Sequence, residues 1–164
     1  MRRILCRVVL CFAVCPLFCQ GMAYAVQNYG PGRFGAGIVL GAPTGLSAKY
    51  WLDKTHAVDA ALGFGDISIH ADFLWHDTGL LGRPRSGRLS AYGGLGAEFK
   101  DYGHNSVLGI RAVGGAAYDF PSDPFEIFLE LVPILRPSLN SGLYLNAGLG
   151  VRYYFQPARS GRYF

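Results

Sequence analysis

Four side chains that could do chemistry lie close together in the sequence: Asp59, Ser68, His70 and Asp72. Two neighbouring carboxylates beside a histidine could form a general acid–base pair or part of a metal site. A serine, a histidine and an acid are also the side chains of a hydrolytic triad. Whether these groups meet depends on local structure, because a spacing of two residues places side chains on one face only in a β-strand.

A metal site in this region is not expected from the spacing of its ligands. A strand rises about 3.3 Å per residue, so His70 and His76 on one strand would lie about 20 Å apart, too far to share an ion. We therefore expect no metal and no cofactor. The favoured interpretation of Asp59, His70 and Asp72 is an interior charge network that Lys49 neutralises.

The elements that would position these residues show a period of two. The clearest is the segment 143–155, where apolar and aromatic residues alternate with Tyr, Asn, Gly and Arg. This alternation is typical of a β-strand with two different faces. The 13 residues exceed the usual five or six of a soluble strand. An aromatic end on the apolar face is typical of a strand that stops at a membrane interface.

Eight segments share this pattern, and the only longer loop between them is 77–88. Short connections between sequential strands favour antiparallel neighbours, and eight such strands can close into a barrel without a free edge. The sequence therefore predicts an all-β fold, an eight-stranded antiparallel up-and-down transmembrane β-barrel. The expected strands are 34–40, 45–52, 56–64, 67–76, 89–100, 108–120, 125–135 and 143–155.

The two faces of these segments predict which side of the barrel meets lipid. Aromatic residues on the apolar face gather at strand ends around an aliphatic middle, which is typical of an interfacial girdle. A basic residue turned toward lipid costs about 2–4 kcal/mol at the midplane, so the charged face must point inward. An eight-stranded barrel is just wide enough for its own side chains. We expect a structural charge network in the lumen, formed by Lys49, Asp59, Asp72, Glu98, Arg111, Glu126, Glu130 and Arg152.

Counting back from the turns predicts how these charges face one another across neighbouring strands. The same register turns Ser68 and His70 inward, whereas a lipid hydrolase needs its triad at the lipid-facing outer leaflet. The expected pairs are Lys49 with Asp59, Asp59 with Asp72, Glu126 with Arg152 and, diagonally, Glu98 with Arg111.

The N-terminal segment 1–25 is predicted to be a secretory signal peptide. Three arginines precede an apolar stretch at 8–18, and Ala23-Tyr24-Ala25 fits a small-x-small cleavage pattern. All four cysteines fall in this segment, so the barrel region 26–155 has none and no disulfide is expected. Without the three leader arginines, 12 basic residues face 11 acidic ones. No basic field for nucleic acid remains.

The end of the last strand predicts how the barrel is assembled. A final strand that ends on an aromatic residue resembles the C-terminal assembly signal of outer-membrane barrels, here Val151, Tyr153 and Phe155. The barrel-assembly machinery is then an expected partner during insertion. Residues 156–164 are interpreted as a short C-terminal tail, and whether Phe155 or Phe164 ends the signal stays open.

Three stretches resemble a family of uncharacterised small outer-membrane β-barrel proteins of Gram-negative bacteria: the hairpin 37–51, the segment 70–76 and the end of the last strand, 148–155. The resemblance spans about 33–155 and implies an OmpA-like barrel without an enzymatic activity that can be named. No catalytic residues can be transferred.

The predicted function is that of a small integral protein of the cell outer membrane, a multi-pass barrel after Sec-type export, with a plugged lumen and a structural or interaction role. We expect a monomer in the lipid bilayer, and no enzyme. With both termini periplasmic, the loop 77–88 falls on the periplasmic side. The alternative is a secreted soluble lipocalin-like barrel that binds a small apolar ligand. A minor alternative is an outer-membrane lipid-modifying enzyme.

Overall fold

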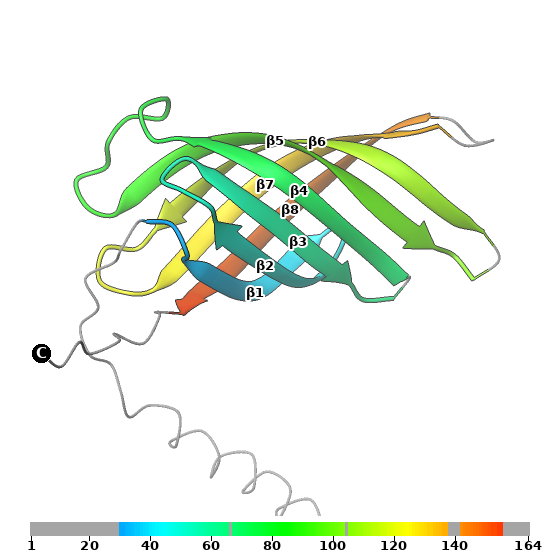
Figure 1. The fold of residues 1–164 in the computed structure, drawn as a ribbon, viewed down its shortest axis with the longest axis horizontal. Helices are drawn as coiled ribbons and strands as arrows, with labels where there is room; N and C mark the ends of the chain where they lie inside the picture. The colour runs from blue at the N-terminus through cyan, green and yellow to red at the C-terminus, as the bar shows by residue number, and fades with distance from the viewer. Residues whose placement is uncertain (1–29, 66, 104, 138–141, 156–164) are drawn as a thin grey trace, which may run out of the picture.

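The chain forms a closed barrel of eight antiparallel strands in up-and-down order (Figure 1). The computed structural model describes residues 30–65, 67–103, 105–137 and 142–155. The expected signal peptide and C-terminal tail lie outside the described residues. The strands are β1 (Phe34–Gly41), β2 (Gly45–Trp51), β3 (His56–Gly63), β4 (Ile67–Asp77), β5 (Arg88–Asp101), β6 (Ser106–Asp119), β7 (Phe125–Arg136) and β8 (Gly142–Phe155).

The predicted all-β, eight-stranded antiparallel up-and-down barrel is confirmed, and every expected strand begins and ends within two residues of an observed one. Each strand pairs with its neighbours in the chain, and β1 closes the sheet by pairing with β8 from Phe34–Phe155 to Gly41–Gly148. Closure leaves no unpaired strand edge. None of the described residues belongs to a helix long and apolar enough to cross a membrane.

The two faces of each strand are inverted relative to a water-soluble barrel. Along β4, exposed and buried positions alternate without interruption. The outward side chains Ile69, Phe73 and Trp75 are exposed, whereas the inward His70 and Asp72 are buried. The polar face therefore fills the lumen, and the apolar face forms the outer surface.

One end of the barrel holds the start of β1 and the end of β8, and we call it the terminal end. The connections 52–55, 78–87 and 120–124 lie at this end, because every second turn of an up-and-down barrel does. Figure 1 shows the long connection between β4 and β5 on the same side as the arrowhead of β8. This loop therefore lies on the same side as the start of β1 and the end of β8, and its periplasmic location stays a prediction.

Aromatic side chains surround the terminal end on the outside. Their rings contact one another in pairs, with centroid distances between 4.8 and 5.9 Å. We call this set of rings the aromatic belt. Two of the contacts join neighbouring strands, β1 to β8 and β7 to β8, and the others lie along one strand or its end. The pairs are Phe34–Phe155, Phe73–Trp75, Tyr118–Phe120, Phe125–Tyr153 and Tyr153–Phe155.

Inward glycines make room for the large side chains of the lumen. A Cβ at Gly150 would collide with the ring of Phe128, and a Cβ at Gly96 would collide with the carboxylate of Asp72. The segment Gly93-Gly94-Leu95-Gly96 is part of strand β5. Its Gly94 and Gly96 pack closely against β4.

Candidate functional site: the charged lumen

The lumen near the terminal end holds a four-residue charge cluster, made of Lys49, Asp59, Glu126 and Arg152. Arg152 donates from Nη1 to Glu126 Oε1 at 2.8 Å and from Nη2 to Asp59 Oδ2. Lys49 donates from Nζ to Glu126 Oε2 at 3.1 Å. All four side chains are buried, and their formal charges cancel. A buried ion cluster of this kind persists only where every charge is paired.

Neighbouring polar and aromatic side chains fix the geometry of this cluster. Tyr154 donates to Glu126 Oε2 at 2.9 Å, and Trp51 donates from Nε1 to the Tyr154 hydroxyl at 3.1 Å. Arg152 donates from Nε to Ser47 Oγ at 2.8 Å. The Arg152 guanidinium also lies 3.7 Å from the centre of the Phe128 ring, a cation–π contact.

A second charge cluster lies farther along the lumen, away from the terminal end, and contains Asp72, Glu98, Arg111 and Arg136. Arg111 donates from Nε to Asp72 Oδ1 at 3.0 Å, and its Nη1 lies 3.6 Å from Glu98 Oε2. Arg136 donates from Nη2 to Glu98 Oε1 at 2.8 Å. Two arginines balance two carboxylates, so this cluster is also formally neutral.

Two further lumen acids lie outside these clusters. Asp119 accepts from Arg33 Nη1 at 3.0 Å, and the Arg33 guanidinium packs 3.6 Å from the centre of the Tyr154 ring. Glu130 accepts from the Tyr92 hydroxyl at 3.4 Å. Tyr92 and Trp51 fill the lumen with their rings, as their inward positions predict.

The predicted strand register is observed. Lys49 faces Asp59, Asp59 faces Asp72, and Glu126 faces Arg152 on neighbouring strands. Glu98 and Arg111 are diagonal, since Arg111 faces Gly96 and Glu98 faces Gly109. The predicted role of Lys49 needs correction, however. Its ammonium bonds to Glu126 on β7, a strand that is not its neighbour, because side chains in a narrow barrel reach across the lumen.

Three charged members of the lumen were missing from the sequence prediction: Arg33, Asp119 and Arg136. Each lies an even number of residues from an inward-facing position and therefore faces inward itself. Arg33 precedes the inward Gly35 by two residues, and Asp119 and Arg136 continue the inward faces of β6 and β7. Extending the alternation of inward and outward residues by one or two positions could therefore have identified them. They were missed because they lie at or just beyond the ends of the expected strands.

The residues considered for catalysis do not form a hydrolytic site. Ser68, His70 and Asp72 all lie on the inward face of β4 and are buried. His70 Nε2 lies 3.7 Å from Asp72 Oδ2, beyond hydrogen-bond distance. Asp72 is instead held by Arg111. The described part of the chain contains no cluster of three His, Cys, Asp or Glu side chains arranged to hold a metal ion.

These side chains fill much of the space inside the barrel. Two neutral ion clusters and large aromatic rings occupy the lumen, and the hydrogen bonds of the clusters tie β2, β3 and β4 to β6, β7 and β8 across the barrel. Such a network stabilises one arrangement of the strands, because each charge that loses its partner would be buried and unpaired.

Comparison with known proteins supports the fold. No family model matches the chain, and no curated protein sequence matches it. Among solved structures, the barrel is similar to the crystal structure of the N-terminal β-barrel domain of Pseudomonas aeruginosa OprF, with a TM-score of 0.50 and 18% sequence identity. The match covers 77% of this chain and 99% of that domain. The chain thus has a closed eight-stranded, up-and-down antiparallel barrel fold similar to that of this domain.

Proposed function

We propose that this chain is a small integral outer-membrane β-barrel protein with a plugged lumen and a structural or interaction role. The observation that carries the proposal is the inversion of the barrel. Charged side chains such as Arg111, Glu126 and Arg152 are at most 1% exposed, while large apolar side chains cover the outer wall. A soluble monomer rarely exposes apolar surface on this scale, whereas a transmembrane barrel requires it.

The outer wall also matches the depth profile of a bilayer. On β8, the aliphatic residues Leu145, Leu149 and Val151 face outward and lead to Tyr153 and Phe155 in the aromatic belt. Tyrosine and tryptophan prefer the interface, and aliphatic side chains prefer the hydrocarbon core. The aromatic belt at the terminal end would then mark the periplasmic boundary of the membrane.

Assembly and topology follow from this location. We infer that Val151, Tyr153 and Phe155 form the assembly signal read by the barrel-assembly machinery, since all three face outward at the end of the last strand. The loop between β4 and β5 would be periplasmic. The protein would act as a monomer in the bilayer, after export directed by the signal peptide.

The side chains in the lumen favour neither of the two alternatives, the soluble lipocalin-like barrel and the lipid-modifying enzyme. A soluble lipocalin-like barrel that binds an apolar ligand would need an apolar interior, but the interior here is filled by Lys49, Arg152 and their partners. A lipid-modifying enzyme would need reactive groups at the lipid face. Ser68 and His70 are enclosed by the barrel instead.

Cell fractionation tests the proposal. We expect the protein in the outer-membrane fraction after a urea wash, with an apparent mass on an unheated gel that differs from that of the heated sample. The folded barrel resists detergent until it is heated, which is the source of this difference. Recovery in the soluble periplasmic fraction without detergent would refute the membrane location.

A further inference from the structure

The outer wall of the barrel is not equally tall on all sides. The Phe155 ring contacts those of Phe34 and Tyr153, which sets β1 and β8 at one level of the aromatic belt. From Tyr153, the outward face of β8 continues for ten residues to Leu143. From Phe34, the outward face of β1 continues for only six residues, to Leu40. Figure 1 shows the same difference, since the hairpins β5–β6 and β7–β8 reach farther from the terminal end than the hairpin β1–β2.

These residue counts correspond to heights along the barrel axis. A strand rises about 3.3 Å per residue, and a strand tilt of about 40° leaves about 2.5 Å of that rise along the axis. The ten residues on β8 therefore cover about 25 Å, the usual height of the apolar band of a membrane barrel. β7 reaches the same height, because ten residues also separate Phe125 in the belt from Leu135. The six residues on β1 cover only about 15 Å.

The low side of the barrel consists of β1, β2 and the turn 42–44, and we call it the low wall. On β2, only four residues separate Tyr50, the ladder partner of Phe34, from Leu46, the outward residue nearest the turn. The last residue of β1, Gly41, lies seven residues from Phe34, at a height of about 17 Å. The turn would therefore lie about 8 Å below the outer limit of an apolar band of about 25 Å.

The step between β1 and β8 leaves one edge of β8 without a neighbouring strand. The ladder between the two strands ends at the pair Gly41–Gly148, and Ala42 then donates its N–H to the Ala147 carbonyl at 3.0 Å. Among the described residues, no strand pairs with β8 on this side between its first residue, Gly142, and Ala147. Backbone N–H and C=O groups on such an edge cannot stay unpaired in hydrocarbon.

The inner face of β8 is open above the low wall as well. By the alternation along β8, Tyr144 faces inward, yet it is 40% exposed, because β1 and β2 end below its level. The centre of its ring lies 4.4 Å from the guanidinium carbon of Arg136, which belongs to the second charge cluster. In a bilayer of even thickness, acyl chains would cross the low wall and cover these polar groups. Hydrocarbon would give them no hydrogen-bond partner.

We propose that the low wall thins the outer leaflet of the membrane beside it, so that lipid headgroups and water reach the free edge of β8. A bilayer adapts to an apolar wall that is too low by thinning locally. Headgroups and water would then bond to the edge groups of Leu143 and Leu145, which point in the direction of the Ala147 carbonyl. These two residues are a short edge for a partner strand, since strands usually have five or six residues. The inference rests on the proposed membrane location, with the terminal end on the periplasmic side.

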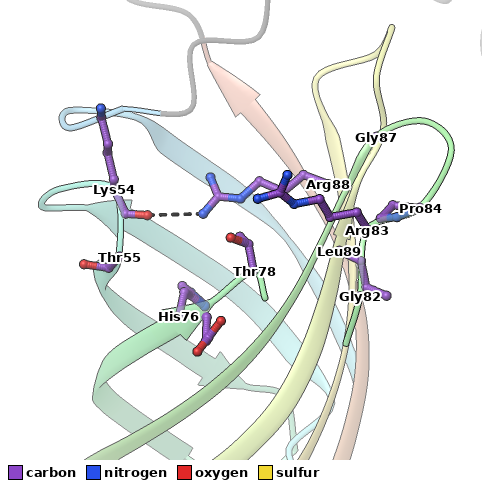
Figure 2. A pocket seen from close by; sticks show the side chains of 11 residues that line it. Lys54, Thr55, His76, Thr78, Gly82, Arg83, Pro84, Gly87, Arg88 and Leu89 are labelled. Atoms are coloured by element: carbon purple, nitrogen blue, oxygen red, sulfur yellow. Dashed lines mark hydrogen bonds between the residues drawn. The ribbon is translucent and has the colours of Figure 1, made fainter. Parts of the chain in front are cut away.

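A tilt of the whole barrel is a poorer response than thinning, because the rim of the terminal end is held together. Arg88 donates from Nη2 to the Lys54 carbonyl at 3.2 Å and joins the start of β5 to the β2–β3 turn (Figure 2). Tyr118 in the belt donates to the Ser86 carbonyl of the long connection at 3.2 Å. A tilt that lifts the low wall would move Phe34 into the hydrocarbon and Tyr118 into water. Belt residues prefer the interface, so such a tilt is opposed.

Three tryptophan positions measure the thickness of the bilayer beside each wall. Trp51 and Trp75 are changed to Phe, and one tryptophan is introduced into the full-length protein by Leu40→Trp, Leu135→Trp or Leu129→Trp, all on the outward face. Position 135 lies at the top of the tall wall. Position 129 lies about 10 Å from the belt, near the midplane. The proteins are folded into phosphatidylcholine vesicles that carry bromine either near the headgroup or near the chain ends.

The ratio of the two quenching efficiencies decides the question. We expect headgroup-proximal bromine to quench Leu135→Trp more strongly and chain-end bromine to quench Leu129→Trp more strongly. With a thinned leaflet, Leu40→Trp behaves like Leu135→Trp. If it behaves like Leu129→Trp instead, the proposal is overturned. It is also overturned if neither lipid quenches Leu40→Trp while Leu135→Trp is quenched, because a second copy of the chain would then cover the low wall. No quenching at all three positions would refute the membrane location itself.

Amide hydrogen exchange of the protein in phosphatidylcholine nanodiscs tests whether water reaches the free edge. The Leu145 amide points to this edge, whereas the Tyr144 amide points to β7, where Tyr144 faces Ile134 in the ladder. The Tyr144 amide is thus the matched control at nearly the same depth. We expect exchange of Leu145 to be at least about tenfold faster than that of Tyr144. Equally slow exchange of both amides would overturn the proposal, because the edge would then be covered by hydrocarbon or by a strand.

Discussion

Arg152 and Glu126 face each other on β8 and β7 and are joined by a hydrogen bond of 2.8 Å between Nη1 and Oε1 in the lumen. Arg152 also bonds to Asp59, on the other side of the barrel lumen. One guanidinium thus connects the last two strands to the third. This connection makes Arg152 the centre of the cluster nearest the terminal end.

Loss of Arg152 should be strongly destabilising. Arg152→Met leaves the carboxylates of Asp59 and Glu126 buried without this partner, which costs about 3–5 kcal/mol of unfolding free energy. Urea unfolding in detergent micelles, followed by the gel mobility of unheated samples, measures the loss. The control Arg85→Met changes an exposed loop residue and should shift stability by less than about 0.5 kcal/mol. Similar losses in both variants would contradict a structural role for Arg152.

The partner of Lys49 can be identified by double-mutant cycles. We expect a coupling energy of about 0.5–3 kcal/mol between Lys49→Met and Glu126→Gln, because their side chains are bonded across the lumen. The coupling between Lys49→Met and Asp59→Asn should be smaller, although these two residues face each other in the strand ladder. The reverse order of the two couplings would mean that the ladder neighbour, and not the cross-lumen contact, sets the pairing.

A charged side chain on the outer wall should lower the free energy of unfolding by an amount that depends on its depth in the bilayer. Leu149 and Leu143 lie on the outward face of β8, but Leu149 is four residues from Tyr153 in the aromatic belt and Leu143 is ten. In a bilayer, Leu149→Arg should lower the unfolding free energy by about 2–4 kcal/mol, and Leu143→Arg should lower it by about 0–1 kcal/mol. Unfolding of both variants from phospholipid vesicles checks this. Equal costs would be inconsistent with a membrane centred near Leu149.

The assembly signal can be located by two changes at the end of the chain. Phe155→Ala should reduce the folded fraction recovered from outer membranes, because it removes the outward aromatic residue that ends β8. Deletion of residues 156–164 should leave that fraction unchanged. Loss of insertion after the deletion, with normal insertion of Phe155→Ala, would move the signal to Phe164.

Much of this fold is readable from the sequence because strand periodicity and turn residues are local signals. The alternation in β4 and β8 specifies which side chains face the lumen, and the short turns fix the register that places Glu126 opposite Arg152. The inward position of Ser68 and His70 follows from the same local pattern.

The contacts across the lumen were not predictable in this way. The bond between Lys49 and Glu126 joins residues 77 positions apart on strands that are not paired, and it depends on the closure and width of the barrel. A pattern along one strand carries no information about such contacts.

The inversion of the barrel is the central claim, and lipid quenching of two neighbouring positions on β7 tests it most directly. Trp51 and Trp75 are changed to Phe, and one tryptophan is introduced by Leu129→Trp on the outward face or by Phe128→Trp on the lumen face. In vesicles with bromine-labelled acyl chains, we predict strong quenching of the outward tryptophan and little quenching of the lumen tryptophan. Quenching of the lumen position alone, or of neither position, would contradict an inverted barrel embedded in a membrane.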